Sequence, residues 1–374
     1  MRGDSPRQAA PTTRVAVLAD AHTDWAPAVA AGIAERHTVL ALTVSSGIWF
    51  LGSNPLGSTR AASAGAAMAM LGTADVVLPL DPSPPVLGLA RVSGLPCGQS
   101  PTTADLAADW WTVRLVAEDA GVSLPAGIRV GRHAARALDY LGPVTIRPGR
   151  PRAPGPRRHI TDAADLAPAL EHALSYADHA VVEETPVGEV VTVALVRRPD
   201  GAVAVSTAAL VDAVASIAST MRAPTTITPT TITPTTPAPT TGASASLTAP
   251  ALATTTATTT STARDPWGLQ SCGGRSGARP PHTSDCWPEC RPADRATPAA
   301  DRERIDRAAL TLMTALGAHG LVTMSFVVDD GPPVLVDLDV LPDLGPRSPA
   351  IRLLRSEGTR YADLLDLLVS GARP

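Results

Sequence analysis

The sequence of 374 residues contains no lysine, so every basic side chain in it is an arginine or a histidine. No apolar run reaches the roughly 18 residues that span a bilayer, and we expect no membrane insertion. The first residues lack the apolar segment of a signal peptide, which predicts a cytoplasmic protein. A net charge of -4 gives no indication of a nucleic-acid partner.

Apolar segments and helical patterns alternate along the first hundred residues. Strands are predicted at 15–18, 38–44 and 75–80, with a helix at 26–35 between the first two. A hydrophobic content of 44% is enough to fill two or three packed subdomains. The βαβ order therefore predicts a parallel sheet with helices against it.

The next part of the chain changes its pattern. Helices are predicted at 105–120 and 163–176, each opened by a residue that can cap a helix. Strands at 180–183 and 190–197 follow, with a glycine turn between them. This order is typical of an antiparallel sheet.

A tract of threonine, alanine, proline and serine runs from 221 to 264 and contains the repeat Thr-Thr-Ile-Thr-Pro at Thr225 and Thr230. Such a tract has too little apolar bulk to offset the entropy of ordering its backbone. We expect a linker or an unstructured insertion.

Four cysteines are present, and three of them follow this tract. Cys272, Cys286 and Cys290, with His282 between them, could form a tetrahedral zinc site. The spacing lacks the paired Cys-x2-Cys knuckle, and free thiols in an unstructured segment are the alternative. Cys97 is expected to be a small buried residue.

Two carboxylates lie near the C-terminus, on the apolar strand predicted to begin at Val334. Asp337 and Asp339 are two residues apart, so they should point to the same side of the strand. Paired oxygen donors of this kind suit a magnesium ion that holds nucleotide phosphates. The alternative is a strand edge with two solvated aspartates.

The segment from Asp337 to Pro342, followed by Gly345-Pro-Arg-Ser348 and a helix ending near Tyr361-Ala-Asp-Leu-Leu, resembles the closing segment of D-alanine–D-alanine ligases, which are members of the ATP-grasp superfamily. Earlier segments resemble that family in the expected order. They begin at Arg14, Asp75, Ala107, Gly142 and Ala180.

The resemblance implies an α/β (α+β) fold class. An N-terminal parallel βαβ domain would precede an ATP-grasp fold of two subdomains, interrupted by the disordered insertion. The expected limits are a disordered leader at 1–13, the N-terminal α/β domain at 14–100, a central ATP-grasp subdomain at 101–196, the partly ordered and then disordered insertion at 197–300, and a C-terminal ATP-grasp subdomain at 301–374.

The resemblance also implies ATP and Mg²⁺ as cofactors and amino acids as substrates, and the family commonly forms homodimers. It assigns each site residue a role: Asp337 and Asp339 hold magnesium, Arg147 steadies phosphate, Glu183 contacts adenine, Glu184 or Glu189 lies near the ribose, and Ser348 and Asp24 orient the substrates.

These residues also have simpler readings. Asp24 could cap the helix that starts near Ala26. Ser348, between Arg347 and Pro349, is also a good helix N-cap. The glutamates could be ordinary surface acids, and the arginines from Arg150 to Arg158, with His159, could be a solvated basic loop rather than a phosphate-binding flap.

The chain departs from the family at positions that matter for catalysis. Trp110 and Arg147 stand where the family has two phosphate-binding lysines, and Val322 and Met324 replace an arginine and an aspartate. Three hypotheses therefore remain. They are a ligase that forms a dipeptide through an acyl phosphate, an inactive relative with a regulatory or partner-binding role, and a related enzyme with another substrate whose missing groups come from a partner.

Overall fold

The computed structural model describes most of the chain outside the threonine-rich tract. The described ranges are 12–52, 60–132, 142–149, 157–198, 200–201, 203–209, 299–356 and 358–373. Most of the expected insertion, the candidate zinc ligands Cys272, His282, Cys286 and Cys290, and most of the expected leader lie outside these ranges.

The N-terminal sheet has five strands in the order β4-β3-β2-β1-β5. They are β1 (Arg14–Asp20), β2 (Thr38–Ser45), β3 (Ile48–Gly52), β4 (Arg60–Ala62) and β5 (Val76–Pro79). The central strand β1 is parallel to both β2 and β5, as the βαβ pattern predicted. Both faces of β1 are buried, which is why its sequence is almost continuously apolar.

Helices flank this sheet. They are α1 (Ala26–Ala34), α2 (Ala64–Leu71) and α3 (Pro84–Ser93). Two antiparallel strands, β3 and β4, were not predicted. Cys97 is buried with the core of this sheet, as expected for a small apolar residue.

Two helices replace the single helix predicted at 105–120. They are α4 (Pro101–Ala107) and α5 (Trp110–Asp119). The backbone of Asp109 is extended, and its side chain accepts a hydrogen bond from the Trp111 N–H. Asp109 therefore ends one helix and caps the next, which makes Trp110 the first residue of α5.

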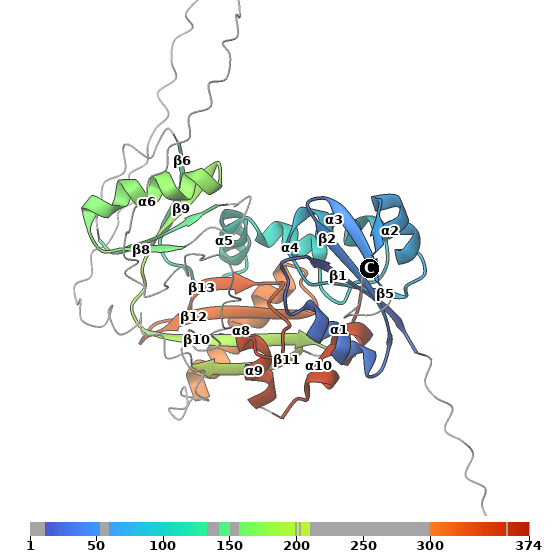
Figure 1. The fold of residues 1–374 in the computed structure, drawn as a ribbon. Coiled ribbons are helices and arrows are strands. Elements are labelled where there is room, and N and C mark those ends of the chain that lie inside the picture. The colour runs from blue at the N-terminus through green and yellow to red at the C-terminus, as the bar shows by residue number, and fades with distance from the viewer. Residues whose placement is uncertain are drawn as a thin grey trace, which may run out of the picture. The chain divides into compact units, whose positions relative to one another are not determined.

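The central sheet is antiparallel, in the order β6-β9-β7-β8 (Figure 1). Its strands are β6 (Gly127–Gly131), β7 (Val144–Pro148), β8 (Arg158–Ile160) and β9 (His179–Glu184). Helix α6 (Ala163–Tyr176) covers one face and packs on Val144, Ile146 and Val182. Because side chains alternate along a strand, Thr145, Arg147 and Glu183 project from the opposite face.

The third sheet is also antiparallel, in the order β11-β10-β12-β13. Its strands are β10 (Glu189–Arg197), β11 (Val203–Ala209), β12 (Leu321–Val328) and β13 (Val334–Asp339). Helix α8 (Ala299–Ala315) buries Ile305, Ala309 and Leu312 in one core. Helices α9 (Pro349–Ser356) and α10 (Tyr361–Ser370) pack in another core, which includes Ala194 and Val196 of β10.

The predicted fold class is confirmed: a sheet with parallel pairing is followed by two antiparallel sheets. Within the described ranges, no helix is both long enough and apolar enough to cross a bilayer.

Candidate functional site

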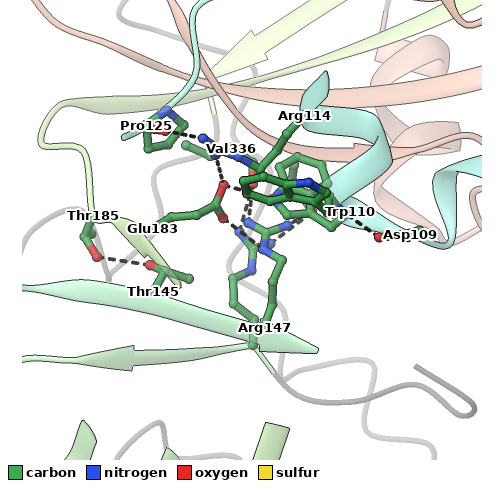
Figure 2. Close-up of polar contacts among 12 residues, drawn as sticks. Asp109, Trp110, Arg114, Pro125, Thr145, Arg147, Glu183, Thr185 and Val336 are labelled. Atoms are coloured by element: carbon green, nitrogen blue, oxygen red, sulfur yellow. Dashed lines mark hydrogen bonds and ion pairs between the residues drawn. The ribbon is translucent and has the colours of Figure 1, made fainter. Parts of the chain in front are cut away.

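Glu183 lies at the centre of a buried polar cluster on the face of the central sheet opposite to helix α6 (Figure 2). Its side chain is only 2% exposed. Oε1 accepts a hydrogen bond from Trp110 Nε1 at 2.9 Å and another from Arg114 Nη1. Oε2 lies 3.1 Å from Arg147 Nε in an ion pair. Both carboxylate oxygens are therefore engaged by groups of the chain itself.

Arg147 links the central sheet to β13. Its guanidinium stacks on the Trp110 ring, with Cζ 4.0 Å from the ring centroid, and Nη2 donates to the Val336 carbonyl at 2.8 Å. Nη1 lies 3.6 Å from Asp337 Oδ1. Burial lowers the pKa of Arg147 to about 10, and the neighbouring charge of Arg157 acts in the same direction. The side chain still carries its positive charge at neutral pH.

A β-bulge in β13 exposes the Val336 carbonyl to these arginines. Ser325 of β12 pairs with Asp337 and Phe326 pairs with Leu335, so Val336 has no partner on β12. Its carbonyl accepts from Arg157 Nη1 at 3.2 Å as well as from Arg147. Arg157 Nη2 lies 3.0 Å from Asp337 Oδ2. One guanidinium thus contacts both the free carbonyl and the adjacent carboxylate.

Arg114 belongs to this cluster and was missed in the sequence. Trp110 and Arg114 are four residues apart on α5, so they lie on the same helix face. Arg114 Nη2 donates to the Pro125 carbonyl at 2.8 Å. The sequence did contain a signal for Arg114, because this charged residue lies within the apolar stripe of Trp110, Val113 and Ala117. A buried arginine requires an acidic partner.

A histidine and a glycine fix the wall beside Trp110. The Trp110 N–H donates to the Gly149 carbonyl at 2.9 Å, and the Gly149 N–H donates to the His179 carbonyl at 2.8 Å. Arg129 Nη2 lies 3.3 Å from His179 Nδ1, which must accept because arginine only donates. His179 Nε2 then carries the proton and faces Asp109 Oδ1 at 3.4 Å. Asp109, the N-cap of α5, therefore lies beside His179 of the central sheet without a hydrogen bond to it.

A cleft of about 270 Å³ lies beside this cluster. The volume is slightly below the range of about 300 to 1,000 Å³ common for small-molecule sites. Its lining residues are Ala107, Ala108, Trp110, Arg147, Pro148, Gly149, Arg157, Asp337 and Leu338. The cleft combines an aromatic ring, two guanidinium groups and one carboxylate, which is a lining suited to an anionic ligand.

Asp339 lies beyond Asp337 on the same strand. Burial raises the pKa of its carboxyl to about 6, and the charges of Asp337 and Asp343 add to the rise, whereas the Leu341 N–H lowers it. The residue as a whole keeps contact with solvent. Its carboxyl is therefore crowded by neighbouring acids although the residue is exposed.

An Asp339→Asn change should stabilise the metal-free protein at pH 8. A folded-state pKa above the unfolded value of about 3.9 means that ionised Asp339 opposes folding, and that this cost disappears as the pH falls from 6 to 4. Because solvent screens the group, we expect a gain of only about 1 kcal/mol. Urea unfolding in EDTA at pH 8 and pH 4.5 measures it. A less stable Asn variant at pH 8 would contradict the crowding.

The structure tests the alternative roles of Ser348 and Asp24 as helix caps. The Ile351 N–H donates to Ser348 Oγ at 3.3 Å, so the alternative role as the cap of α9 is confirmed. Helix α1 begins after Trp25 without a side-chain cap, so the capping role of Asp24 is wrong. Asp24 instead raises the pKa of Asp343, after burial of that carboxyl, which places these two acids near each other.

The remaining predicted site residues stay predictions. Arg147, Glu183 and Asp337 are in direct contact, whereas Glu184 is half-buried at the end of β9 and Glu189 is exposed at the start of β10. No group of three or more metal-binding side chains occurs in the part of the chain that the structure describes. Met324, at the position of a third acid, is buried in the core of the third sheet.

Asp337 and Asp339 are the two carboxylates that β13 offers to a magnesium ion. Magnesium usually keeps several waters and takes one or two protein carboxylates together with substrate phosphates. The raised pKa of Asp339, to which Asp337 and Asp343 contribute, marks a place where a cation would relieve repulsion between acids.

Comparison with known proteins gives a limited sequence match. No protein-family model matches the chain. A D-alanine–D-alanine ligase of Corynebacterium urealyticum is 40% identical over 70 residues, which cover 19% of this chain and 19% of the relative. The match thus spans about a fifth of the length of that relative.

Solved structures match over almost the whole chain. The VanG D-Ala:D-Ser ligase from Enterococcus faecalis has a TM-score of 0.64 at 14% identity and covers 96% of this chain and 99% of its own. D-alanyl-alanine synthetase A from Vibrio cholerae has a TM-score of 0.63 at 13% identity, covering 97% and 98%.

A third structure, D-alanine–D-alanine ligase from Bacillus anthracis complexed with ATP, has a TM-score of 0.58 at 14% identity and covers 96% and 97%. The resemblance inferred from the sequence motifs is therefore confirmed for the fold. This chain has the fold of these D-alanine–D-alanine and D-Ala:D-Ser ligases, at a sequence identity of 13 to 14%.

Proposed function

We propose that the chain is an ATP-dependent ligase that joins the carboxylate of one amino acid to the amine of another through an acyl phosphate. The observation that carries the proposal is the fold, which follows ligases of this kind along 96% of the chain or more. The cleft adds support, because Arg147 of β7 and Asp337 of β13 line it, and Glu183 of β9 contacts Arg147 from the buried side.

Each residue has a role that its environment allows. Arg147 and Arg157 present guanidinium N–H groups that can fork onto phosphate oxygens. Asp337 and Asp339 would hold magnesium, which when bound neutralises charge on the transferred phosphoryl group. Glu183 fixes the position of Arg147 and of Trp110 through their shared contacts.

The proposed substrates are D-alanine or a related amino acid. Asp24 and Asp343 are acids that could receive a substrate ammonium group, and the charge of Asp24 contributes to the raised pKa of Asp343. Ser348 caps α9 through its oxygen and still has a hydroxyl proton to donate to a carboxylate.

The test is a steady-state assay of ADP release with Mg-ATP, with and without D-alanine, combined with mass spectrometry of the dipeptide. We expect ADP release that depends on the amino acid. An Arg147→Met change should lower kcat by about 100-fold or more, because it removes a cation placed for developing negative charge.

Arg158→Gln is the matched control. Arg158 is exposed, and its charge acts on His172 of α6, on the other face of the sheet. We expect this variant to keep the wild-type rate. An Arg147→Met enzyme that is as fast as wild type would contradict the assigned role.

A second candidate is an inactive relative that binds a nucleotide without ligation. It is favoured by Glu183, whose two oxygens are already occupied by Trp110, Arg114 and Arg147. Mg-ATP binding without any ADP release, for any amino acid offered, would support this candidate over the ligase.

A further inference from the structure

Two arginines engage Asp337, the first of the two proposed magnesium ligands. Arg157 Nη2 lies 3.0 Å from Oδ2 and Arg147 Nη1 lies 3.6 Å from Oδ1, so each carboxylate oxygen faces a guanidinium. Both arginines also donate to the Val336 carbonyl, which the β-bulge leaves free. Each planar guanidinium uses one terminal nitrogen for the carbonyl and the other for the carboxylate.

Positive charge exceeds negative charge among the residues in direct contact. Among the described residues, three arginines, Arg114, Arg147 and Arg157, contact two carboxylates, Glu183 and Asp337, so this set of contacts contains one more guanidinium than carboxylate. Arg147 Nε is buried and lies 3.1 Å from Glu183 Oε2, but it is not aligned for a hydrogen bond. The cluster is thus short of anionic acceptors.

This arrangement opposes a divalent cation at Asp337. A metal ion would have to displace Arg157 from the carboxylate and would then lie beside positively charged guanidinium groups. An anion has the opposite effect, because it supplies acceptors to the guanidinium groups and draws them away from Asp337.

We propose that Arg147 and Arg157 form a gate that keeps a divalent cation off Asp337 until an anionic ligand engages the two guanidinium groups. The inference rests on the proposed function only in taking Asp337 as a metal ligand. Arg157 is the movable part, because its side chain is 42% exposed whereas that of Arg147 is 11% exposed. By linkage, the anion and the cation then strengthen each other's binding.

The test measures binding of Mn²⁺ alone, by the loss of the free-ion electron paramagnetic resonance signal, without nucleotide. An Arg157→Gln variant should bind Mn²⁺ about three- to tenfold more tightly than wild type. The estimate combines loss of an exposed ion pair with removal of one positive charge beside the ion. Arg157→Ala serves as a second variant with the same expectation.

Two further variants make the result specific. Arg158→Gln removes the same charge from the adjacent residue and should leave Mn²⁺ affinity within about twofold of wild type. Adding Asp337→Asn to Arg157→Gln should abolish the gain. Equal affinities for the Arg157→Gln and Arg158→Gln proteins would overturn the gate, as would a gain that survives the Asp337→Asn change.

Inorganic phosphate tests the opening of the gate. After correction with a protein-free titration, phosphate should raise the Mn²⁺ affinity of wild type more than that of Arg157→Gln. An equal response would overturn the proposal. These binding measurements are separate from ligase activity. If the wild type releases ADP but Arg157→Gln binds Mn²⁺ no more tightly than wild type, the ligase proposal stands and the gate fails. If Arg157→Gln binds Mn²⁺ more tightly but no amino acid elicits ADP release, the gate stands and the ligase proposal fails.

Discussion

A Glu183→Gln change should lower the free energy of unfolding by about 3 to 5 kcal/mol, the cost typical of breaking a buried ion pair by removing one partner. The carboxylate is 2% exposed and balances the charges of Arg114 and Arg147 inside the protein. Glutamine keeps the shape of the side chain but not its charge, so Arg114 and Arg147 would lose their buried counterion. Asp337, which is half-exposed, would be the remaining acid of the cluster.

Urea unfolding followed by circular dichroism measures this loss. Glu189→Gln is the control, since Glu189 is an exposed acid at the start of β10, and its substitution should change stability by less than about 0.5 kcal/mol. If the two variants unfold at the same urea concentration as wild type, Glu183 is not the centre of the cluster.

A Gly149→Ala change should destabilise the protein by about 3 kcal/mol, at the upper end of the usual range for overpacking a buried site. An added Cβ would overlap the His179 imidazole. The ring cannot yield easily, because it is held between Arg129 and Asp109. The backbone of Gly149 would move instead, and with it the hydrogen bond from the Trp110 N–H.

Gly131→Ala is the matched control. Gly131 pairs with His179 across the same sheet, yet a Cβ added there meets no atom within 4 Å. Its substitution should be neutral or stabilise slightly, by about 0.5 kcal/mol, through the unfolded state. Thermal unfolding of both variants distinguishes the cases. A Gly149→Ala protein as stable as the Gly131→Ala protein would show that the wall beside Trp110 is loosely packed.

The periodicity of apolar residues in the sequence was sufficient to predict the buried strands of the parallel sheet. The parallel pairing of β1 with β2 and β5 was predicted from the alternation of apolar strands and helical patterns alone. The hairpin of β2 and β3 was missed, although its signal was present. Ser46 and Gly47 both have positive φ, which is typical of a two-residue hairpin turn.

The helix break at Asp109 was missed for a different reason. The alanines and leucine before it favour a continuous helix, and an aspartate within a helix is only mildly unfavourable. Its capping bond to the Trp111 N–H and its approach to His179 decide the outcome. His179 lies 70 positions further along the chain, so no local pattern could reveal that contact.

The candidate site could be predicted only in part. The family resemblance pointed to Arg147, Glu183 and Asp337, and the structure brings these three together. It could not show that Arg147 joins the two acids, because that depends on the bulge at Val336 and on Arg114. In a chain without lysine, arginines supply the positive charges of this cluster, and Arg147 and Arg157 both contact Asp337.

The account depends most on Mg-ATP binding at the carboxylates of β13. Isothermal titration of the purified protein with Mg-ATP should show one site, and the double change Asp337→Asn and Asp339→Asn should weaken it by tenfold or more, of the order found when support for a bound metal is removed. Arg158→Gln should bind as wild type does. Equal affinity of the wild-type and double-variant proteins for Mg-ATP would contradict the account.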